Sequence, residues 1–187
     1  MSLTVDPIIT PRGPVRLRPM TSRDLDRIVE LEGQLFGSSA WSYGMLADEL
    51  GALGRWYIVA DLDVKDEAGG DTVIGYAGSW FDGDVSQIMT IGVSPQYQRL
   101  SLGTMLLDAL INRARQVHAG AILLEVAVNN AAAISLYERH GFERISTRRR
   151  YYQPGDIDAY VMRKILTTPT PSPGPIGHEA LPQEDHE

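Results

Sequence analysis

The sequence predicts a mixed α/β fold in which helices flank a central sheet. Apolar runs of strand length alternate with segments of helical periodicity in the second half of the chain. Over the whole chain, these segments follow the order βααβββαβαββ. Because strands flank helices in the second half and strands also follow one another directly, a mixed sheet is expected.

The chain of 187 residues is expected to hold one domain with tails, since typical domains contain about 100 to 200 residues. We expect this domain over residues 15–166, after an N-terminal extension at residues 1–14. Residues 167–187 are rich in proline, glycine and acidic side chains and have little apolar surface to bury. This composition predicts a disordered tail.

The first elements are a strand and two helices. The segment "VRLRPM", residues 15–20, is typical of a short strand. Thr21 and Asp24 then fit a capping box, with Thr21 as the N-cap residue. Apolar residues at helical spacing predict a helix over residues 25–36, and a second short helix is predicted over residues 43–50.

Three strands and a helix follow. The segments "RWYIVADL" (55–62) and "TVIGYAGSWF" (72–81) predict two strands. Between them, the acidic and glycine-containing residues 63–71 are typical of a long hairpin loop. A third strand is predicted over residues 85–93 and a helix over residues 103–118.

The last part of the chain adds a strand, a helix and two further strands. The apolar segment "AILLEVAV", residues 121–128, leads into a predicted helix over residues 131–140. Gly141 is a natural residue to end that helix. Two strands, over residues 142–152 and 158–165, close the predicted domain.

Composition limits the class of protein. Hydrophobic residues make up 43% and charged residues 22% of the chain, as in globular proteins, and no apolar run is long enough to span a bilayer. The N-terminal segment does not have the pattern of a secretory signal. The chain has no cysteine, which excludes disulfides, thiolate catalysis and cysteine-ligated zinc. A cytoplasmic location is therefore expected, without a membrane partner.

The net charge and the spacing of the histidines argue against two kinds of binding partner, nucleic acid and metal ions. The formal net charge of −7 and the sequence pI of about 5.1 argue against non-specific binding to nucleic acid. The short basic cluster of Arg148, Arg149 and Arg150 fits either solvated strand ends or a phosphate-binding patch. His178 and His186 lie in the tail without a useful metal spacing, and no metal is expected.

The segment "QRLSLG", residues 98–103, lies between a predicted strand and a predicted helix. At such a turn the first helical N–H groups are unpaired and the positive end of the helix dipole faces outward, which suits a phosphate group. Gly103 is present, whereas Ser101 stands two residues before it. Ser101 could lie at negative φ and offer only its amide, or it could add its hydroxyl as a second donor. Taken alone, the segment is also typical of an ordinary helix start.

Glu125, Asn130 and Tyr137 are candidate functional residues that also have structural explanations. Glu125 lies in the middle of an apolar strand, either on a solvated face or in a partly buried cleft where a carboxylate can act as a general base. Asn130 begins the next predicted helix, and its spacing to Tyr137 places both residues on one helix face. An N-cap asparagine and a core tyrosine are the structural alternatives.

Together, these segments resemble the GCN5-related N-acetyltransferase (GNAT) superfamily. "QRLSLG" resembles that family's pyrophosphate loop, Q/R-x-x-G-x-G/A, except that Ser101 replaces the first glycine. "LLEVAVNNAAAISLYERHGF", "RRRYY" and "DAYVM" further resemble RimI-type ribosomal-protein alanine N-acetyltransferases. "ELEGQLFGSSAWS" resembles their first-helix substrate loop, with Ala40 where proline is usual. The resemblance covers residues 15–164 and implies the GNAT fold, whose two central parallel strands splay apart.

The resemblance implies that acetyl-CoA binds between the strands "QIMTIGV" and "AILLEVAV". The backbone of Ile91, Gly92 and Val93 is expected to hold the pantetheine and the thioester carbonyl, and Asn130 is expected to contact the pantetheine arm. The expected pyrophosphate ligands are the backbone amides of consecutive residues in the loop and the first helical turn. These residues are Arg99, Leu100, Ser101, Leu102, Gly103 and Thr104.

The resemblance also implies the catalytic roles. Glu125 matches the family's general base, acting through water, and Tyr137 matches the acid that protonates the departing thiolate. Acetyl transfer needs both roles, because an ammonium group cannot attack a thioester and a thiolate leaves more readily when a proton is near.

The acceptor implied by the resemblance is the N-terminal amine of a protein, such as the alanine of a ribosomal protein. Tyr151 and Tyr152 match the family's paired tyrosines beside the acceptor peptide. Phe36 and Trp41 are candidates for the same wall, or else core aromatic residues. Two other functions stay open at the level of the sequence: an acetyltransferase for a small-molecule amine, and a CoA-binding module without catalysis. The sequence does not indicate the oligomeric state.

Overall fold

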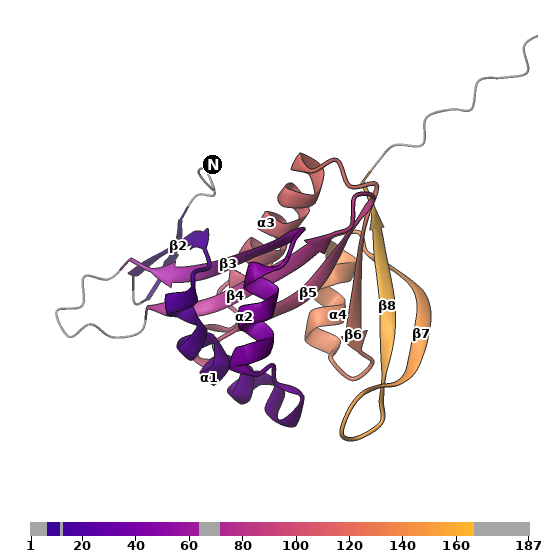
Figure 1. Cartoon of the computed structure of the whole chain (residues 1–187), viewed down its shortest axis with the longest axis horizontal. Coiled ribbons are helices and arrows are strands. Elements are labelled where there is room, and N and C mark those ends of the chain that lie inside the picture. The colour runs from indigo at the N-terminus through magenta and orange to yellow at the C-terminus, as the bar shows by residue number, and fades with distance from the viewer. Residues whose placement is uncertain (1–6, 12, 64–71, 167–187) are drawn as a thin grey trace, which may run out of the picture.

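The computed structural model describes residues 7–11, 13–63 and 72–166. Its centre is an eight-stranded sheet with the strand order β1-β2-β3-β4-β5-β6-β8-β7 (Figure 1). The strands are β1 Ile8–Thr10, β2 Gly13–Pro19, β3 Arg55–Leu62, β4 Val73–Phe81, β5 Val85–Val93, β6 Ala121–Ala127, β7 Glu143–Tyr152 and β8 Ile157–Ile165. The α-helices are α1 Leu25–Phe36, α2 Tyr43–Gly51, α3 Leu102–Gln116 and α4 Ala131–Arg139. The predicted mixed α/β fold is confirmed.

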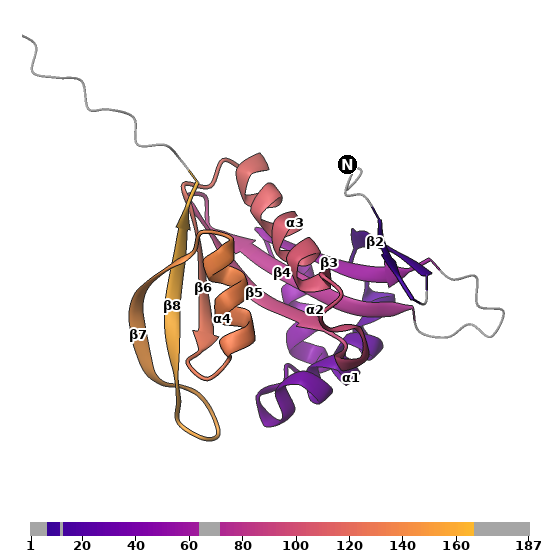
Figure 2. The ribbon, with the colours of Figure 1, turned by 180° about the vertical axis from the view of Figure 1, so that it is seen from behind.

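Helices cover both faces of the sheet. Helices α1 and α2 lie on one face, and α3 and α4 lie on the other (Figures 1 and 2). Along β3, the buried side chains alternate between the two layers: Tyr57 and Val59 join the core under α1 and α2, whereas Ile58 and Ala60 join the core under α3. The central strands are therefore buried on both sides, which explains their continuous apolar runs.

Strands β5 and β6 are parallel, and they pair along only part of their length. Val85–Gln87 pair with Ala121–Leu123, after which the register between β5 and β6 ends. A register shift in the β4–β5 pair, where Gly78 faces Thr90 and Ser79 faces Ile88, leaves Met89 as an extra residue. The splayed parallel strands expected from the resemblance are confirmed, and they open the sheet at its centre.

Some local features differ from the predictions. Strand β1 was not predicted; it lies within residues 1–14 and pairs antiparallel with β2, with Ile8 opposite Val15. The capping box forms, with the Thr21 amide donating to the Asp24 carboxylate at 2.7 Å, but it opens a 3-10 turn, Ser22–Asp24, before α1.

Two predicted segments cannot be compared with the structure. Strands β3 and β4 pair as the hairpin prediction requires, but residues 64–71 of its loop lie outside the described residues. The predicted tail at 167–187 also lies outside them. Within the described part of the chain, no helix is both long and apolar enough to cross a membrane.

Candidate active site

A cleft opens where β5 and β6 diverge, and it consists of two adjoining pockets of about 340 Å³ each. The tyrosine-side pocket is lined from the α1–α2 loop, β5, β6 and β7. The helix-side pocket is lined from α1, β5, β6 and α4. Six residues line both pockets: Ser39, Trp41, Ile88, Met89, Glu125 and Tyr152. The two pockets therefore meet around Glu125 and form one continuous site.

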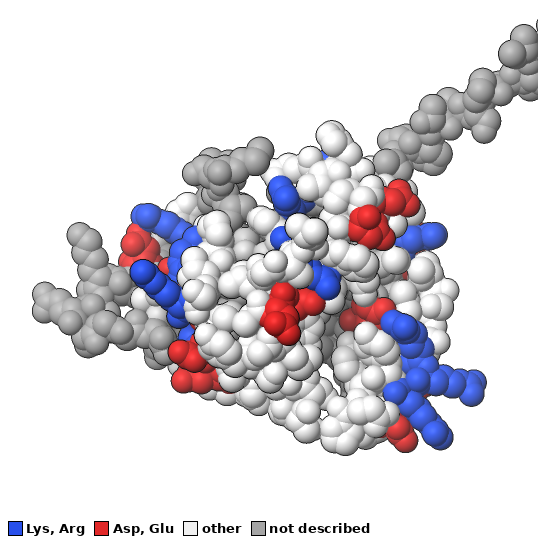
Figure 3. Space-filling model, in the orientation of Figure 1, with Lys and Arg blue, Asp and Glu red and all other residues white. Residues whose placement is uncertain are grey.

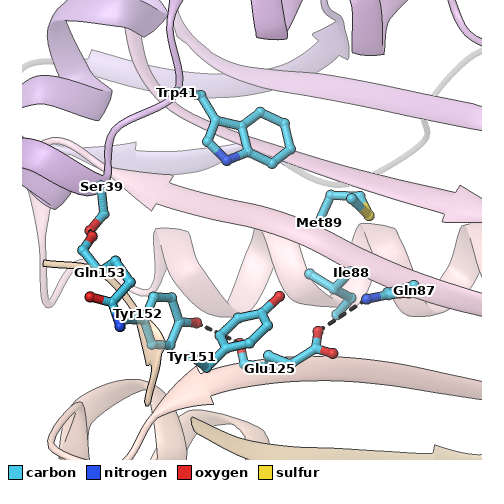
Figure 4. Close-up of a pocket in the computed structure, with 9 residues that line it drawn as sticks. All are labelled: Ser39, Trp41, Gln87, Ile88, Met89, Glu125, Tyr151, Tyr152 and Gln153. Carbon is cyan, nitrogen blue, oxygen red and sulfur yellow. Dashed lines mark hydrogen bonds between the residues drawn. The ribbon is translucent and has the colours of Figure 1, made fainter. Parts of the chain in front are cut away.

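Glu125 lies in this cleft, on β6, with a side chain that is 13% exposed. The Gln87 side-chain amide donates to one carboxylate oxygen at 3.0 Å, and an Arg148 guanidinium N–H donates to the other at 2.7 Å. Figure 4 shows the Glu125 carboxylate beside Gln87, with Trp41 on the far side of the pocket. Of the two predicted locations for Glu125, a solvated sheet face or a partly buried cleft, the structure has the cleft. The two hydrogen bonds fix the orientation of the carboxylate.

Tyr137 lies on α4, almost fully buried, and lines the helix-side pocket. Burial raises the pKa of its hydroxyl well above the ordinary value, and the neighbouring Tyr152 adds to the shift. The hydroxyl therefore keeps its proton at neutral pH. Asn130 lines the same pocket, so the predicted shared face of Asn130 and Tyr137 does face the cleft.

Four aromatic residues predicted for the acceptor wall also line the cleft. Trp41 lines both pockets, Tyr151 the tyrosine-side pocket and Phe36, 40% exposed, the helix-side pocket. Tyr152 lines both pockets and donates from its hydroxyl to the backbone carbonyl of Glu125 at 3.2 Å. Burial, with smaller effects from Tyr151 and Glu125, raises the pKa of Tyr152 to about 12. Tyr151 and Tyr152 pack edge to face with ring centroids 5.0 Å apart.

The residues predicted to hold the cofactor are spread along β5 and the start of α3. Of the β5 residues, Ile91 lines the helix-side pocket, and Gly92 and Val93 continue the strand beyond it. At Gly92 an added Cβ would lie 2.4 Å from the Tyr76 ring, so this position requires glycine for packing against Tyr76. None of residues 99–104, in the loop and first helical turn, lines either pocket.

Ser101 is the N-cap residue of α3 and lies at φ +62° and ψ +8°. The negative-φ arrangement considered for Ser101 is therefore wrong. This left-handed conformation is the one in which glycine is favoured, so the serine occupies the position at some cost in backbone strain. The family pattern has its first glycine at this same position. The left-handed conformation explains why glycine is favoured there.

The start of α3 differs from the starts of two other helices. At α2 the Ser42 hydroxyl accepts from the Met45 amide, and at α4 the Asn130 side chain accepts from the Ala133 amide at 3.1 Å. The Ser101 side chain makes no such bond at α3. The first-turn amides of α3 thus lack a side-chain cap from the N-cap residue, and this arrangement suits an external anion.

Several residues in and beside the cleft were not predicted as site residues, among them three with charged or polar side chains. Gln87 and Arg148 bind the Glu125 carboxylate, and Glu32 of α1 lines the helix-side pocket as a buried carboxylate. The Arg148 side chain is 54% exposed on β7, as the solvated interpretation expects, and it also forms an ion pair with Glu125 that neither interpretation of the basic cluster included. Basic side chains gather over β7 at the edge of the sheet (Figure 3).

The geometry agrees with a comparison of the chain with known protein families. The model of the Acetyltransferase (GNAT) family matches residues 28–142. The chain belongs to this family. The predicted resemblance is thus confirmed, and the chain is identified as an acetyltransferase.

Two individual relatives indicate the type of acetyltransferase within this family. The N-alpha-acetyltransferase RimI of Mycobacterium tuberculosis is 38% identical over 162 residues, which cover 84% of this chain and 96% of that protein. The crystal structure of the ribosomal-protein-S18-alanine N-acetyltransferase from Escherichia coli matches with a TM-score of 0.71 and 27% identity, covering 84% of this chain and 97% of that one. The RimI-type resemblance is therefore confirmed as well.

A third structure supports the fold alone. The structure of NAA60 from Arabidopsis thaliana in complex with acetyl-CoA matches with a TM-score of 0.72 and 16% identity, over 81% of this chain and 98% of that one. That protein binds acetyl-CoA in the same fold.

Proposed function

We propose that this protein is an N-terminal acetyltransferase, which transfers the acetyl group of acetyl-CoA to the α-amine of a protein. The preferred acceptor is the alanine N-terminus of a small-subunit ribosomal protein, met in the cytoplasm. The observation that carries the proposal is that Glu125 and Tyr137, a carboxylate and a protonated phenol, line one cleft between two splayed strands. The similarity to RimI over most of the chain supports the same acceptor class.

The residues present fit acetyl-CoA, which when bound supplies an acetyl group activated as a thioester. The backbone of Ile91, Gly92 and Val93 would hold the pantetheine, since β5 loses its pairing with β6 after Gln87. The backbone amides of residues 99–104 would hold the pyrophosphate, and the absence of a side-chain cap at Ser101 supports this role.

Asn130 would contact the pantetheine arm. Its side-chain oxygen already accepts from the Ala133 amide as the N-cap of α4, so its Nδ2 group is the donor left for a ligand. Asn130 thereby combines its structural role with a binding role.

Glu125 acts as the general base on the acceptor. Gln87 and Arg148 fix its two carboxylate oxygens, so the carboxylate is oriented before an acceptor arrives. An incoming α-ammonium group can replace Arg148 as the positive partner of Glu125 and then lose a proton to it, directly or through water. An α-amine has an ordinary pKa near 7.7–8.0 against about 10.4 for lysine, so its deprotonation costs roughly 3.5 kcal/mol less near neutral pH.

Tyr137 acts as the acid. It gives its hydroxyl proton to the leaving sulfur while the acceptor nitrogen forms the new bond to the acetyl carbon. Burial raises the pKa of this hydroxyl, so the proton is present at the pH of the reaction.

Trp41, Phe36, Tyr151 and Tyr152 form the wall for the acceptor peptide. Tyr151 and Tyr152 come from the end of β7, and Trp41 comes from the α1–α2 loop on the other side of the cleft (Figure 4). A peptide held between them reaches Glu125 with its first residue.

Incubation with acetyl-CoA and two panels, alanine-starting peptides and small amines, tests the proposal through release of free CoA and the mass of the products. We expect acetylated peptides and no acetylated small amines. Acetylation of small amines alone would contradict the proposed acceptor. Binding of acetyl-CoA in a calorimetric titration without turnover on either panel would contradict the proposed catalysis.

A further inference from the structure

Glu32 is a buried carboxylate that the proposed mechanism does not use. It lies on α1, is 1% exposed and lines the helix-side pocket. Its carboxylate accepts from the backbone N–H of Trp41 at 3.0 Å and from the Tyr76 hydroxyl at 2.6 Å. The Thr90 hydroxyl is a third, longer donor at 3.4 Å. All three donors are neutral, and within the described ranges no ion pair to Glu32 forms.

An isolated carboxylate in an apolar core is costly, and three neutral donors offset that cost only in part. The burial of Glu32 therefore needs a reason other than the stability of α1. The donors provide one, because they come from three separate elements: the α1–α2 loop, β4 and β5. The carboxylate joins these elements directly beneath the cleft.

Trp41 is the donor that belongs to the wall of the cleft. Besides the Ser42 cap of α2, two side-chain hydrogen bonds connect the α1–α2 loop with other parts of the described chain. Glu32 holds the loop at the Trp41 amide, and the Ser39 hydroxyl donates to the Gln153 carbonyl at 2.6 Å across the cleft. The bond to Glu32 fixes the backbone at the residue whose indole lines both pockets.

We propose that Glu32 is a positioning residue of the acceptor site, which fixes Trp41 through its backbone amide and so forms the acceptor wall in advance. The proposal rests on the N-terminal acetyltransferase function proposed above. Because the wall is already ordered, binding of the acceptor does not carry the entropy cost of ordering the wall. Glu32 therefore affects the affinity for the acceptor. It leaves the proton transfers by Glu125 and Tyr137 unchanged.

Three variants separate positioning from general stability. In Glu32→Gln, the amide oxygen can accept from Trp41 while its NH₂ donates to the Tyr76 hydroxyl, so the anchor survives without the charge. Glu32→Met has a similar length and no acceptor for the Trp41 amide. Tyr76→Phe removes the 2.6 Å bond but leaves the bond to Trp41, and it serves as the matched control for lost stability.

Steady-state kinetics on an alanine-starting peptide give the first readout. We expect Glu32→Met to raise KM for the peptide about three- to tenfold, with kcat and the KM for acetyl-CoA near the wild-type values. Glu32→Gln should recover most of this loss, and Tyr76→Phe should keep the wild-type KM although it unfolds at a lower temperature. An equal loss in Glu32→Gln and Glu32→Met would overturn the anchor, as would a wild-type peptide KM in Glu32→Met.

The second readout does not depend on activity. The protein is labelled with 5-fluorotryptophan, and the Trp41 ¹⁹F resonance is assigned by its loss in Trp41→Phe. We expect this resonance to shift and broaden in Glu32→Met, and to keep its wild-type position and width in Glu32→Gln and Tyr76→Phe. If the wild type acetylates no peptide, the proposed function fails while the ¹⁹F spectra still test the anchor. An unchanged Trp41 resonance in folded Glu32→Met would overturn the proposed anchor.

A fallback variant covers the case in which Glu32→Met does not fold. The double variant Glu32→Met/Tyr76→Phe no longer buries the Tyr76 hydroxyl, and it then replaces Glu32→Met in both readouts.

Discussion

The two sides of the cleft use different parts of the chain. The proposed acceptor side consists of side chains, with the Glu125 carboxylate held by Gln87 and Arg148 and aromatic rings around it. The proposed cofactor side consists of backbone, along the unpaired end of β5 and the first turn of α3. This difference predicts which substitutions each side tolerates: the acceptor side should depend on the chemical identity of its residues, and the cofactor side on the path of its backbone.

The largest effect should follow from removing the charge on the acceptor side. Glu125→Gln keeps the shape of the side chain but removes the base, and we expect kcat on an alanine-starting peptide to fall about 10²–10⁴-fold. Glu138→Gln, at an exposed glutamate on α4 that pairs with Arg144, is the matched control. Peptide acetylation followed by mass spectrometry measures both variants. Near-wild-type turnover in Glu125→Gln would remove the base from the mechanism.

Tyr137→Phe should have the next largest effect. It keeps the buried ring and its packing on Phe142, 5.8 Å between centroids, and removes only the hydroxyl. We expect kcat to fall about tenfold or more, because the leaving sulfur loses its proton donor. Tyr160→Phe on β8 controls for the loss of a tyrosine hydroxyl. Equal rates for the two variants would contradict the role of Tyr137.

On the backbone side, Gly92→Ala tests a steric requirement. The added Cβ would lie 2.4 Å from the Tyr76 ring, and we expect the free energy of unfolding to fall by about 1–3 kcal/mol. Gly33→Ala on α1 has no atom within 4 Å of the added Cβ and should stabilise the helix by about 0.5–1 kcal/mol. Urea unfolding curves of the two variants compare them. Equal stability would mean that Tyr76 moves away at little cost.

Ser101→Gly should have the smallest effect. Glycine relieves the left-handed conformation of this residue, and we expect the free energy of unfolding to rise by at most about 1 kcal/mol. The KM for acetyl-CoA should change only modestly, because the backbone amide is retained. A large fall in that KM would show that the serine side chain obstructs the phosphate.

The fold was largely predictable from the sequence because its signals are local. Apolar periodicity gave the order of the elements from β2 to β8, and Gly141 marked the end of α4. Strand β1 gave no such signal, because three residues beside two prolines become a strand only through pairing with β2. The left-handed φ of Ser101 could not be predicted either, because serine at a helix start usually lies at negative φ.

The site was predictable where the family pattern names residues, and less so where distant segments meet. Arg148 lies on β7, 23 residues after Glu125 in the chain. Register shifts between Arg144 and Ser146 and between Arg148 and Tyr152 interrupt the regular pairing of β7 with β8, so strict alternation along the strand does not predict which face Arg148 occupies. Glu32 did have a signal. It lies four residues after Ile28 and seven after Leu25, on the apolar stripe of α1, although its partners Tyr76 and Thr90 could not be read from that helix.

The most direct measurement of the central claim is the position of the acetyl group on a peptide that offers two amines. A peptide with an N-terminal alanine and an internal lysine is incubated with acetyl-CoA and either the wild type or Glu125→Gln, and tandem mass spectrometry locates the product. The account predicts acetylation of the α-amine by the wild type and its near absence with Glu125→Gln. Acetylation of the lysine in place of the α-amine, or equal products from both proteins, would contradict it.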